Sequence, residues 1–92
     1  MKKSNKNIFK DLGFNDSDAA NLEARARLML LLEKEINRLK MTQAQVAAEL
    51  GVKPPRVSEL LNGKMEKFSL DLLIVYLARL GKTVDFKLKQ AA

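Results

Sequence analysis

The stretch from Thr42 to Gly63, TQAQVAAELGVKPPRVSELLNG, constrains the fold of this chain more than any other. It has room for a helix, a tight turn and a second helix, which is the length of a helix-turn-helix unit. Thr42 and Gln45 are spaced as in a capping box, where two side chains satisfy free backbone N–H groups at the start of a helix. Gly51 follows an apolar helical face and suits the left-handed conformation that ends a helix. The sequence therefore predicts two short helices joined at residue 51.

The second of these helices is expected to begin at two prolines. Pro54 and Pro55 lack the N–H group that an interior helix position needs, but the N–H groups of the first turn have no partner within the helix anyway. Apolar residues then recur at helical spacing up to Leu61, and Gly63 follows as a stop signal. We expect a Pro-led helix with one buried face and an exposed N-terminal half.

At these residues the chain resembles the XRE (Cro/C1-type) helix-turn-helix proteins, through the pattern T-Q-x-x-V-A-x-x-L-G-V-x-x-x-x-V-S-x-L-x-N-G. The flanking segments NIFKDLGF, GKMEKFSLDLL and LGKTVDFKL are similar to those of a HigA-like antitoxin subgroup. The resemblance implies a mostly α fold, a lambda-repressor-like bundle of about five helices. It also implies a palindromic double-stranded DNA operator as partner, no cofactor, and a toxin similar to HigB or RelE ribonucleases.

A recognition helix projects polar side chains of its N-terminal half into the major groove. Arg56 is the main candidate for base reading, because its guanidinium fork matches O6 and N7 of guanine. Glu59 suits either a cytosine amino group or an ion pair with Arg56 three residues earlier. Gln43 resembles the phosphate-binding glutamine of the family. The full predicted DNA-binding set is Gln43, Lys53, Pro54, Pro55, Arg56, Ser58, Glu59, Asn62, Lys64 and Lys67.

The chain departs from the family pattern at the start of this helix. Relatives often carry Ser or Gln where this chain has Lys53, Pro54 and Pro55. The prolines offer contact area for a thymine methyl group but no hydrogen-bond donor, so more of the sequence readout falls to Arg56.

Three segments are expected along the chain. Residues 1–17 form a basic, partly ordered N-terminal segment, residues 18–82 the helical domain with its helix-turn-helix at 42–63, and residues 83–92 a C-terminal dimerisation strand and tail. A long first helix should run from about residue 18 to 40, and its apolar stripe is wider than one buried face needs. The apolar residues of the first segment must pack on their own domain or bind a toxin. They are Ile8, Phe9, Leu12 and Phe14.

Near the C-terminus the period of the sequence changes from that of a helix to that of a strand. Apolar and polar residues alternate, and no second strand of comparable quality exists to pair with this one. Pairing with the same strand of a second copy about a two-fold axis solves this problem. The alternative is a frayed or helical tail. The predicted intermolecular ribbon consists of Thr83, Val84, Asp85, Phe86, Lys87 and Leu88.

Composition narrows the function further. Seventeen Lys and Arg against eleven Asp and Glu give a net charge of +6, which favours a polyanionic partner. The chain has no Cys and no His, so ordinary zinc sites, thiol catalysis and His general-base chemistry are excluded, and an enzyme is not expected. The start lacks a secretory signal and no segment reaches membrane-span length, which predicts a cytoplasmic protein.

The main hypothesis is a homodimeric, sequence-specific DNA-binding repressor that serves as the antitoxin of a HigBA/RelE-type pair, represses its own operon and neutralises the toxin. The alternative is a stand-alone XRE-family regulator without a toxin. A pure protein-interaction module that uses the apolar N-terminal segment is a third hypothesis, and it predicts no binding to any duplex.

Overall fold

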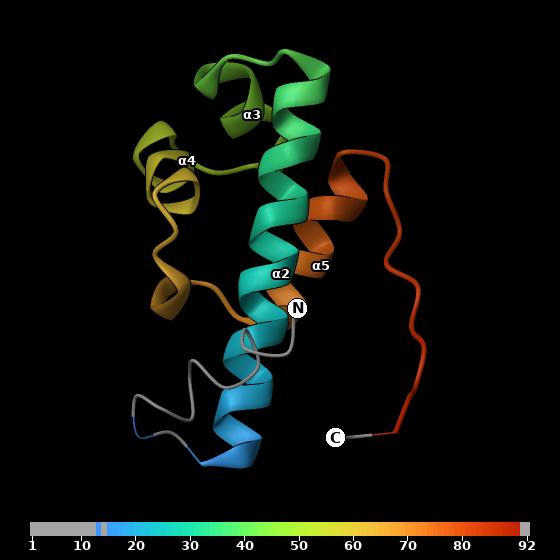
Figure 1. The fold of residues 1–92 in the computed structure, drawn as a ribbon. Helices are drawn as coiled ribbons and strands as arrows, with labels where there is room; N and C mark the ends of the chain where they lie inside the picture. The colour runs from blue at the N-terminus through green and yellow to red at the C-terminus, as the bar shows by residue number, and fades with distance from the viewer. Residues whose placement is uncertain (1–12, 14, 91–92) are drawn as a thin grey trace.

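Helix α2 (Asp16–Leu39) is the axis along which the other helices pack (Figure 1). The computed structural model describes residues 13 and 15–90 of the chain. Asn15 caps α2, because its side chain accepts a hydrogen bond from the Asp18 N–H at 2.8 Å. The helix ends at Lys40, which takes a left-handed conformation with φ 55°. It therefore starts two residues before the predicted position and ends without the glycine that usually fills such a place.

Three further α-helices and one short 3-10 helix complete the described part of the chain. They are α3 (Gln43–Leu50), α4 (Pro54–Leu61), η1 (Met65–Lys67) and α5 (Leu70–Arg79). Helix α5 packs along α2, while α3 packs mainly on α4, so the α3–α4 pair projects from one side of the long helix (Figure 1). Ser69 caps α5, because its side chain accepts a hydrogen bond from the Leu72 N–H at 3.3 Å.

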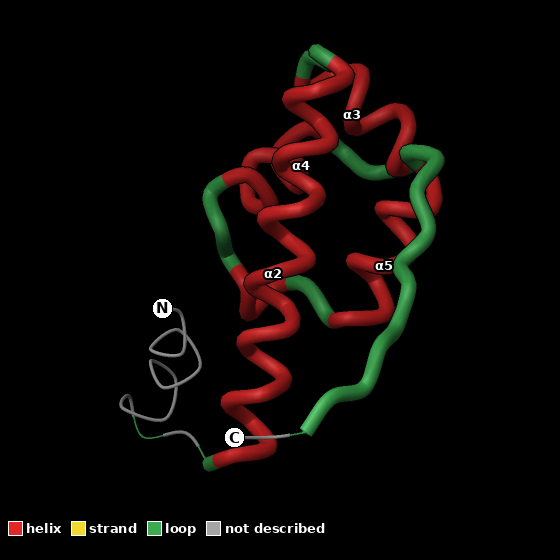
Figure 2. The backbone as a smooth tube through the Cα atoms, turned by 45° about the vertical axis from the view of Figure 1, so that its right-hand side comes forward, coloured by secondary structure: helices red, strands yellow, loops and turns green. Residues whose placement is uncertain are grey.

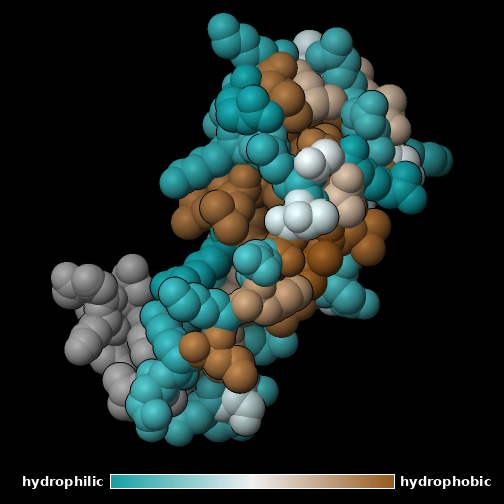
Figure 3. Space-filling model, turned by 90° about the vertical axis from the view of Figure 1, so that its right-hand side faces the viewer, coloured by the Kyte–Doolittle hydropathy of each residue, from teal (hydrophilic) through white to brown (hydrophobic). Residues whose placement is uncertain are grey.

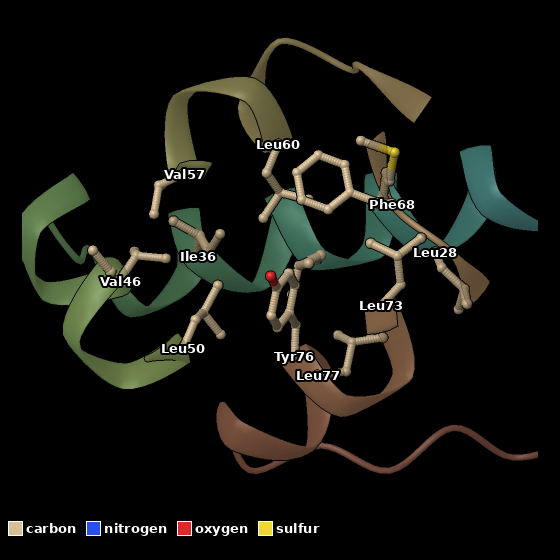
Figure 4. Packing of buried hydrophobic residues seen from close by; sticks show 13 residues of the cluster. Leu28, Ile36, Val46, Leu50, Val57, Leu60, Phe68, Leu73, Tyr76 and Leu77 are labelled. Carbon is tan, nitrogen blue, oxygen red and sulfur yellow. The ribbon is translucent and has the colours of Figure 1, made fainter. Parts of the chain in front are cut away.

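The core lies where all four α-helices meet (Figure 4). Val46 of α3 and Val57 of α4 are completely buried, and they belong to the same apolar cluster as Ile36 of α2. Phe68, 1% exposed, occupies the junction between η1 and α5, where its ring meets Tyr76 edge-on at a centroid distance of 6.2 Å. This packing fixes the angle between α3 and α4, because both helices contribute their buried face to the same cluster.

The expected count of about five helices is not confirmed: the described residues form four α-helices and one 3-10 helix. The predicted strand is not present in the single chain either. The described residues after α5 turn back and run in an extended path toward the end of the molecule where α2 begins (Figure 2). Residues 83–90 form no backbone–backbone hydrogen bond with the described part of the chain, and the Phe86 N–H donates to the side chain of Asp85 at 3.2 Å. A strand requires a partner strand, and the described single chain supplies none.

No helix in the part of the chain that the structure describes is both long and apolar enough to cross a lipid bilayer.

Candidate nucleic-acid interface

The turn between α3 and α4 has the geometry that the sequence predicts. The Thr42 hydroxyl accepts a hydrogen bond from the Gln45 N–H at 3.1 Å, and the Gln45 side chain accepts one from the Thr42 N–H at 2.8 Å, which confirms the capping box. Gly51 has φ 73° and ends α3, and the following Val52 N–H donates to the Ala47 carbonyl at 2.9 Å. A side chain at residue 51 would be strained in this left-handed conformation. The two helices are therefore held in a fixed relation by local bonds.

Helix α4 exposes its N-terminal half, as predicted. Lys53 is the N-cap residue and makes no capping bond with its side chain, and Pro54 and Pro55 occupy the first turn. All three are exposed. The buried side chains of α4 are Val57 and Leu60, which lie on its opposite face. A ligand that approaches the exposed face meets a cation and two proline rings at the tip of the helix.

Arg56 lies on this helix but is bound within the protein. Its Nη2 donates to the carbonyl of Lys67 at 2.9 Å, and its guanidinium carbon lies 4.2 Å from the centroid of the Phe68 ring. The predicted ion pair with Glu59 is confirmed, with Nη1 and Oε1 3.4 Å apart. In the free protein Arg56 therefore ties α4 to the segment around η1.

Glu59 contacts a second cation of the predicted set. Its Oε2 is 3.3 Å from Nζ of Lys67, so the carboxylate lies between Lys67 and Arg56. The hydrogen bond from Lys67 is the main reason that the pKa of Glu59 is lowered, with Arg56 adding to the effect. The carboxylate thus remains charged at neutral pH and partly neutralises the surface on which both cations lie.

The remaining predicted DNA-binding residues lie around this network rather than in it. Gln43 occupies the first position of α3 and is exposed, Asn62 ends α4, and Ser58 is half-buried on α4. Lys53 and Lys64 are exposed and form no ion pair with any described residue. Among the described residues, Lys53 and Lys64 therefore have no ion-pair partner, whereas Arg56 and Lys67 share the carboxylate of Glu59.

Several contacts of this surface carried no signal in the sequence. Arg56 lies over the ring of Phe68, which is 12 positions away in the chain. Arg25 Nη1 donates to the carbonyl of Met65, 40 positions away, at 3.1 Å. Neither separation corresponds to neighbouring positions on one helix. The bridge between Lys67 and Glu59 was likewise not predicted, because it depends on how η1 folds back toward α4.

The predicted dimerisation residues are exposed in the single chain except one. Val84 is half-buried and packs on the core, whereas Phe86 is 76% and Leu88 99% exposed. Apolar side chains gather in the middle of the face that carries α5 and the C-terminal tail (Figure 3). The alternative toxin-binding residues lie outside the described part of the chain. They are Ile8, Phe9, Leu12 and Phe14.

No group of acidic residues suited to a metal ion occurs among the described side chains.

Comparison with known proteins agrees with this geometry. A family model described as a helix-turn-helix domain matches residues 8–89. A solved structure described as an XRE family transcriptional regulator is 35% identical, covers 80% of this chain and 83% of its own, and superposes with a TM-score of 0.74. None of the curated proteins matches the chain.

Proposed function

Because the chain belongs to the XRE-type helix-turn-helix family of DNA-binding transcriptional regulators, we propose that it is a sequence-specific repressor that inserts α4 into the major groove of an operator. One observation carries this proposal: α4 buries Val57 and Leu60 in the core while Lys53, Pro54 and Pro55 stay exposed at its tip. A helix held in this way can enter a groove without unfolding any part of the domain.

In this proposal different residues of the predicted set bind phosphates and read bases. Exposed Gln43, with the first N–H groups of α3, binds one phosphate and sets the register of the protein on the duplex. Lys53 and Lys64, which have no ion pair with a described residue, bind further phosphates. Arg56 reads guanine once it leaves its internal partners, and this single fork supplies most of the base preference.

Selection from a randomised duplex library tests this function. We expect enrichment of a palindrome whose half-sites lie about 34–36 Å apart along the duplex, with guanine in each half-site. Arg56→Ala should lose the guanine preference, at a cost of about 1–3 kcal/mol per half-site. Enrichment of no sequence by the wild-type protein, together with no retention of duplex in dilute salt, would contradict the proposal.

We further propose that the protein acts as a homodimer joined by a ribbon of two C-terminal strands. Phe86 and Leu88 support this, because two large apolar side chains exposed on one extended segment favour a covered state. Phe86→Ser should yield monomers in light scattering, whereas Lys87→Ser, which changes the alternate side of the same strand, should leave dimers. A dimer that survives Phe86→Ser and deletion of residues 83–92 would exclude the ribbon.

The finer proposal is that the protein is an antitoxin of a HigBA/RelE-type pair. Its support is the similarity of the flanking segments to HigA-like antitoxins and the presence of apolar side chains open to a partner, such as Leu30 and Leu31 of α2, which are 56% and 52% exposed. Co-expression with the product of the adjacent reading frame, followed by affinity capture, tests it. A stable complex with a small basic protein is expected. Failure to form one, with operator binding intact, would favour the stand-alone regulator.

A further inference from the structure

Glu59 lies between two cations of the predicted DNA-binding set, Arg56 and Lys67. Its carboxylate oxygens are 3.4 Å from Nη1 of Arg56 and 3.3 Å from Nζ of Lys67. The two cations are separated by eleven positions in the chain, and one carboxylate therefore joins α4 to η1. All three side chains remain partly exposed, with 34% of Glu59, 33% of Arg56 and 46% of Lys67 accessible. Solvent, and hence a ligand, can reach this carboxylate.

The arrangement around Glu59 is held from several directions. Arg56 donates to the Lys67 carbonyl at 2.9 Å while its guanidinium stacks on the ring of Phe68. The backbone carbonyl of Glu59 accepts from the Lys64 N–H at 3.2 Å. These bonds hold the backbone at Lys67 near Glu59, so the ion pair has to order only the side chain of Lys67.

We propose that Glu59 is an internal competitor of DNA phosphate, which occupies Arg56 and Lys67 in the free protein and lowers the affinity of the surface for duplex DNA in general. The inference rests on the proposed function and deepens it. To contact DNA, Arg56 and Lys67 must each give up Glu59 for a phosphate or a base edge. Binding therefore replaces one ionic contact of each cation with another and adds none. Lys53 and Lys64 have no described ion-pair partner and bear no such cost.

This arrangement has a consequence for discrimination between sites. A competitor that occupies Arg56 and Lys67 lowers the affinity for every duplex, and a duplex that offers phosphates alone has no base contact to offset the loss. A duplex that also offers guanine to the fork of Arg56 recovers the exchange through an additional bidentate contact. Glu59 therefore lowers the occupancy of the many sites in a genome that offer phosphates alone.

Titration of a random-sequence duplex by fluorescence anisotropy tests the inference without knowledge of the operator. Glu59→Gln keeps the shape of the side chain and removes its charge. We expect it to bind at least about threefold more tightly than the wild-type protein, because two partly exposed ion pairs no longer compete. The log–log salt dependence should steepen by about 0.9 for each additional phosphate neutralised.

Glu66→Gln is the matched control. Glu66 is exposed in η1, adjacent to Lys67, and forms no ion pair with a described residue. Glu66→Gln removes the same charge from the same surface as Glu59→Gln, so a general effect of net charge would appear in both variants. In a Lys67→Met background the gain from Glu59→Gln should shrink, because one of its two partners is gone.

The results separate the inference from the function on which it rests. If the wild-type protein binds duplex and Glu59→Gln binds equally, more weakly, or no better than Glu66→Gln, the competitor role is overturned while DNA binding stands. If neither the wild-type protein nor Glu59→Gln binds duplex, the proposed function fails and the inference with it. A measurement on the wild-type chain covers the case of an unstable variant: the side-chain carboxyl carbon of Glu59 should shift in NMR spectra on addition of duplex, and an unchanged signal would overturn the proposal.

Discussion

Replacing Arg56 with alanine should lower the stability of the free protein, and not only its affinity for DNA. Arg56 donates to the Lys67 carbonyl at 2.9 Å and lies 4.2 Å above the ring of Phe68, which is almost completely buried. A hydrogen bond from a charged group contributes about 1.5–3 kcal/mol, and a cation–π contact about 0.5–1 kcal/mol at an exposed site. The low ends apply because one third of the side chain is exposed, which gives about 2 kcal/mol for both contacts.

Thermal and urea unfolding followed by circular dichroism would measure this loss. For a domain of this size, a loss of about 2 kcal/mol corresponds to a fall in Tm of roughly 8–16 °C. The variants must be compared at the same protein concentration, because the Tm of the proposed dimer depends on concentration. Lys53→Ala is the control, since Lys53 is exposed and its side chain makes no capping bond. It should change stability by less than about 0.5 kcal/mol while still weakening DNA binding. A Tm for Arg56→Ala that matches that of Lys53→Ala would show that Arg56 is free in solution and would refute the network.

Three further substitutions test separate features of the domain. Gly51→Ala should cost about 1 kcal/mol of unfolding free energy, because φ is 73° at this residue. The cost comes from the backbone, since the added Cβ would lie 3.7 Å from Arg79 Nη1, which is an ordinary contact. An unchanged urea midpoint would contradict this. Thr42→Ala removes the capping box and should cost about 1 kcal/mol by the same assay, and no loss would show that α3 does not depend on its cap. Glu59→Gln should lower Tm at neutral pH, because the lowered pKa of Glu59, caused first by Lys67, means that its charged form stabilises the fold. The difference in Tm between the wild-type protein and Glu59→Gln should be fully present above the ordinary carboxyl pKa of about 4.3. It should disappear as the pH falls through the lower pKa that Glu59 has in the folded protein. A difference in Tm that persisted in acid would exclude an ionic cause.

Local chemistry explains why the helix-turn-helix could be predicted from the sequence. The side chains at 42 and 45, the glycine at 51 and the prolines at 54 and 55 each fix the backbone within a few residues of themselves. The structure confirms all of these features. The ion pair between Arg56 and Glu59 could be predicted for the same reason, because residues three apart on a helix are neighbours.

Features that depend on distant parts of the chain could not be predicted in this way. Phe68 meets Arg56 only because the chain folds back toward α4 after η1, and nothing in the spacing of the two residues indicates this contact. The end of α2 at Lys40 is another example, since the left-handed conformation there is adopted by a residue that rarely takes it. The predicted C-terminal strand would need a second chain as its partner, so it stays a prediction about an assembly.

The central claim is that α3 and α4 together form the surface that binds duplex DNA. Amide NMR spectra of the labelled protein, recorded while a duplex is added in dilute salt, test it most directly. The expected shifts lie at Gln43 and along residues 53–67, with the outer faces of α2 and α5 unaffected. Shifts confined to those outer faces, or no change at any amide, would contradict the claim.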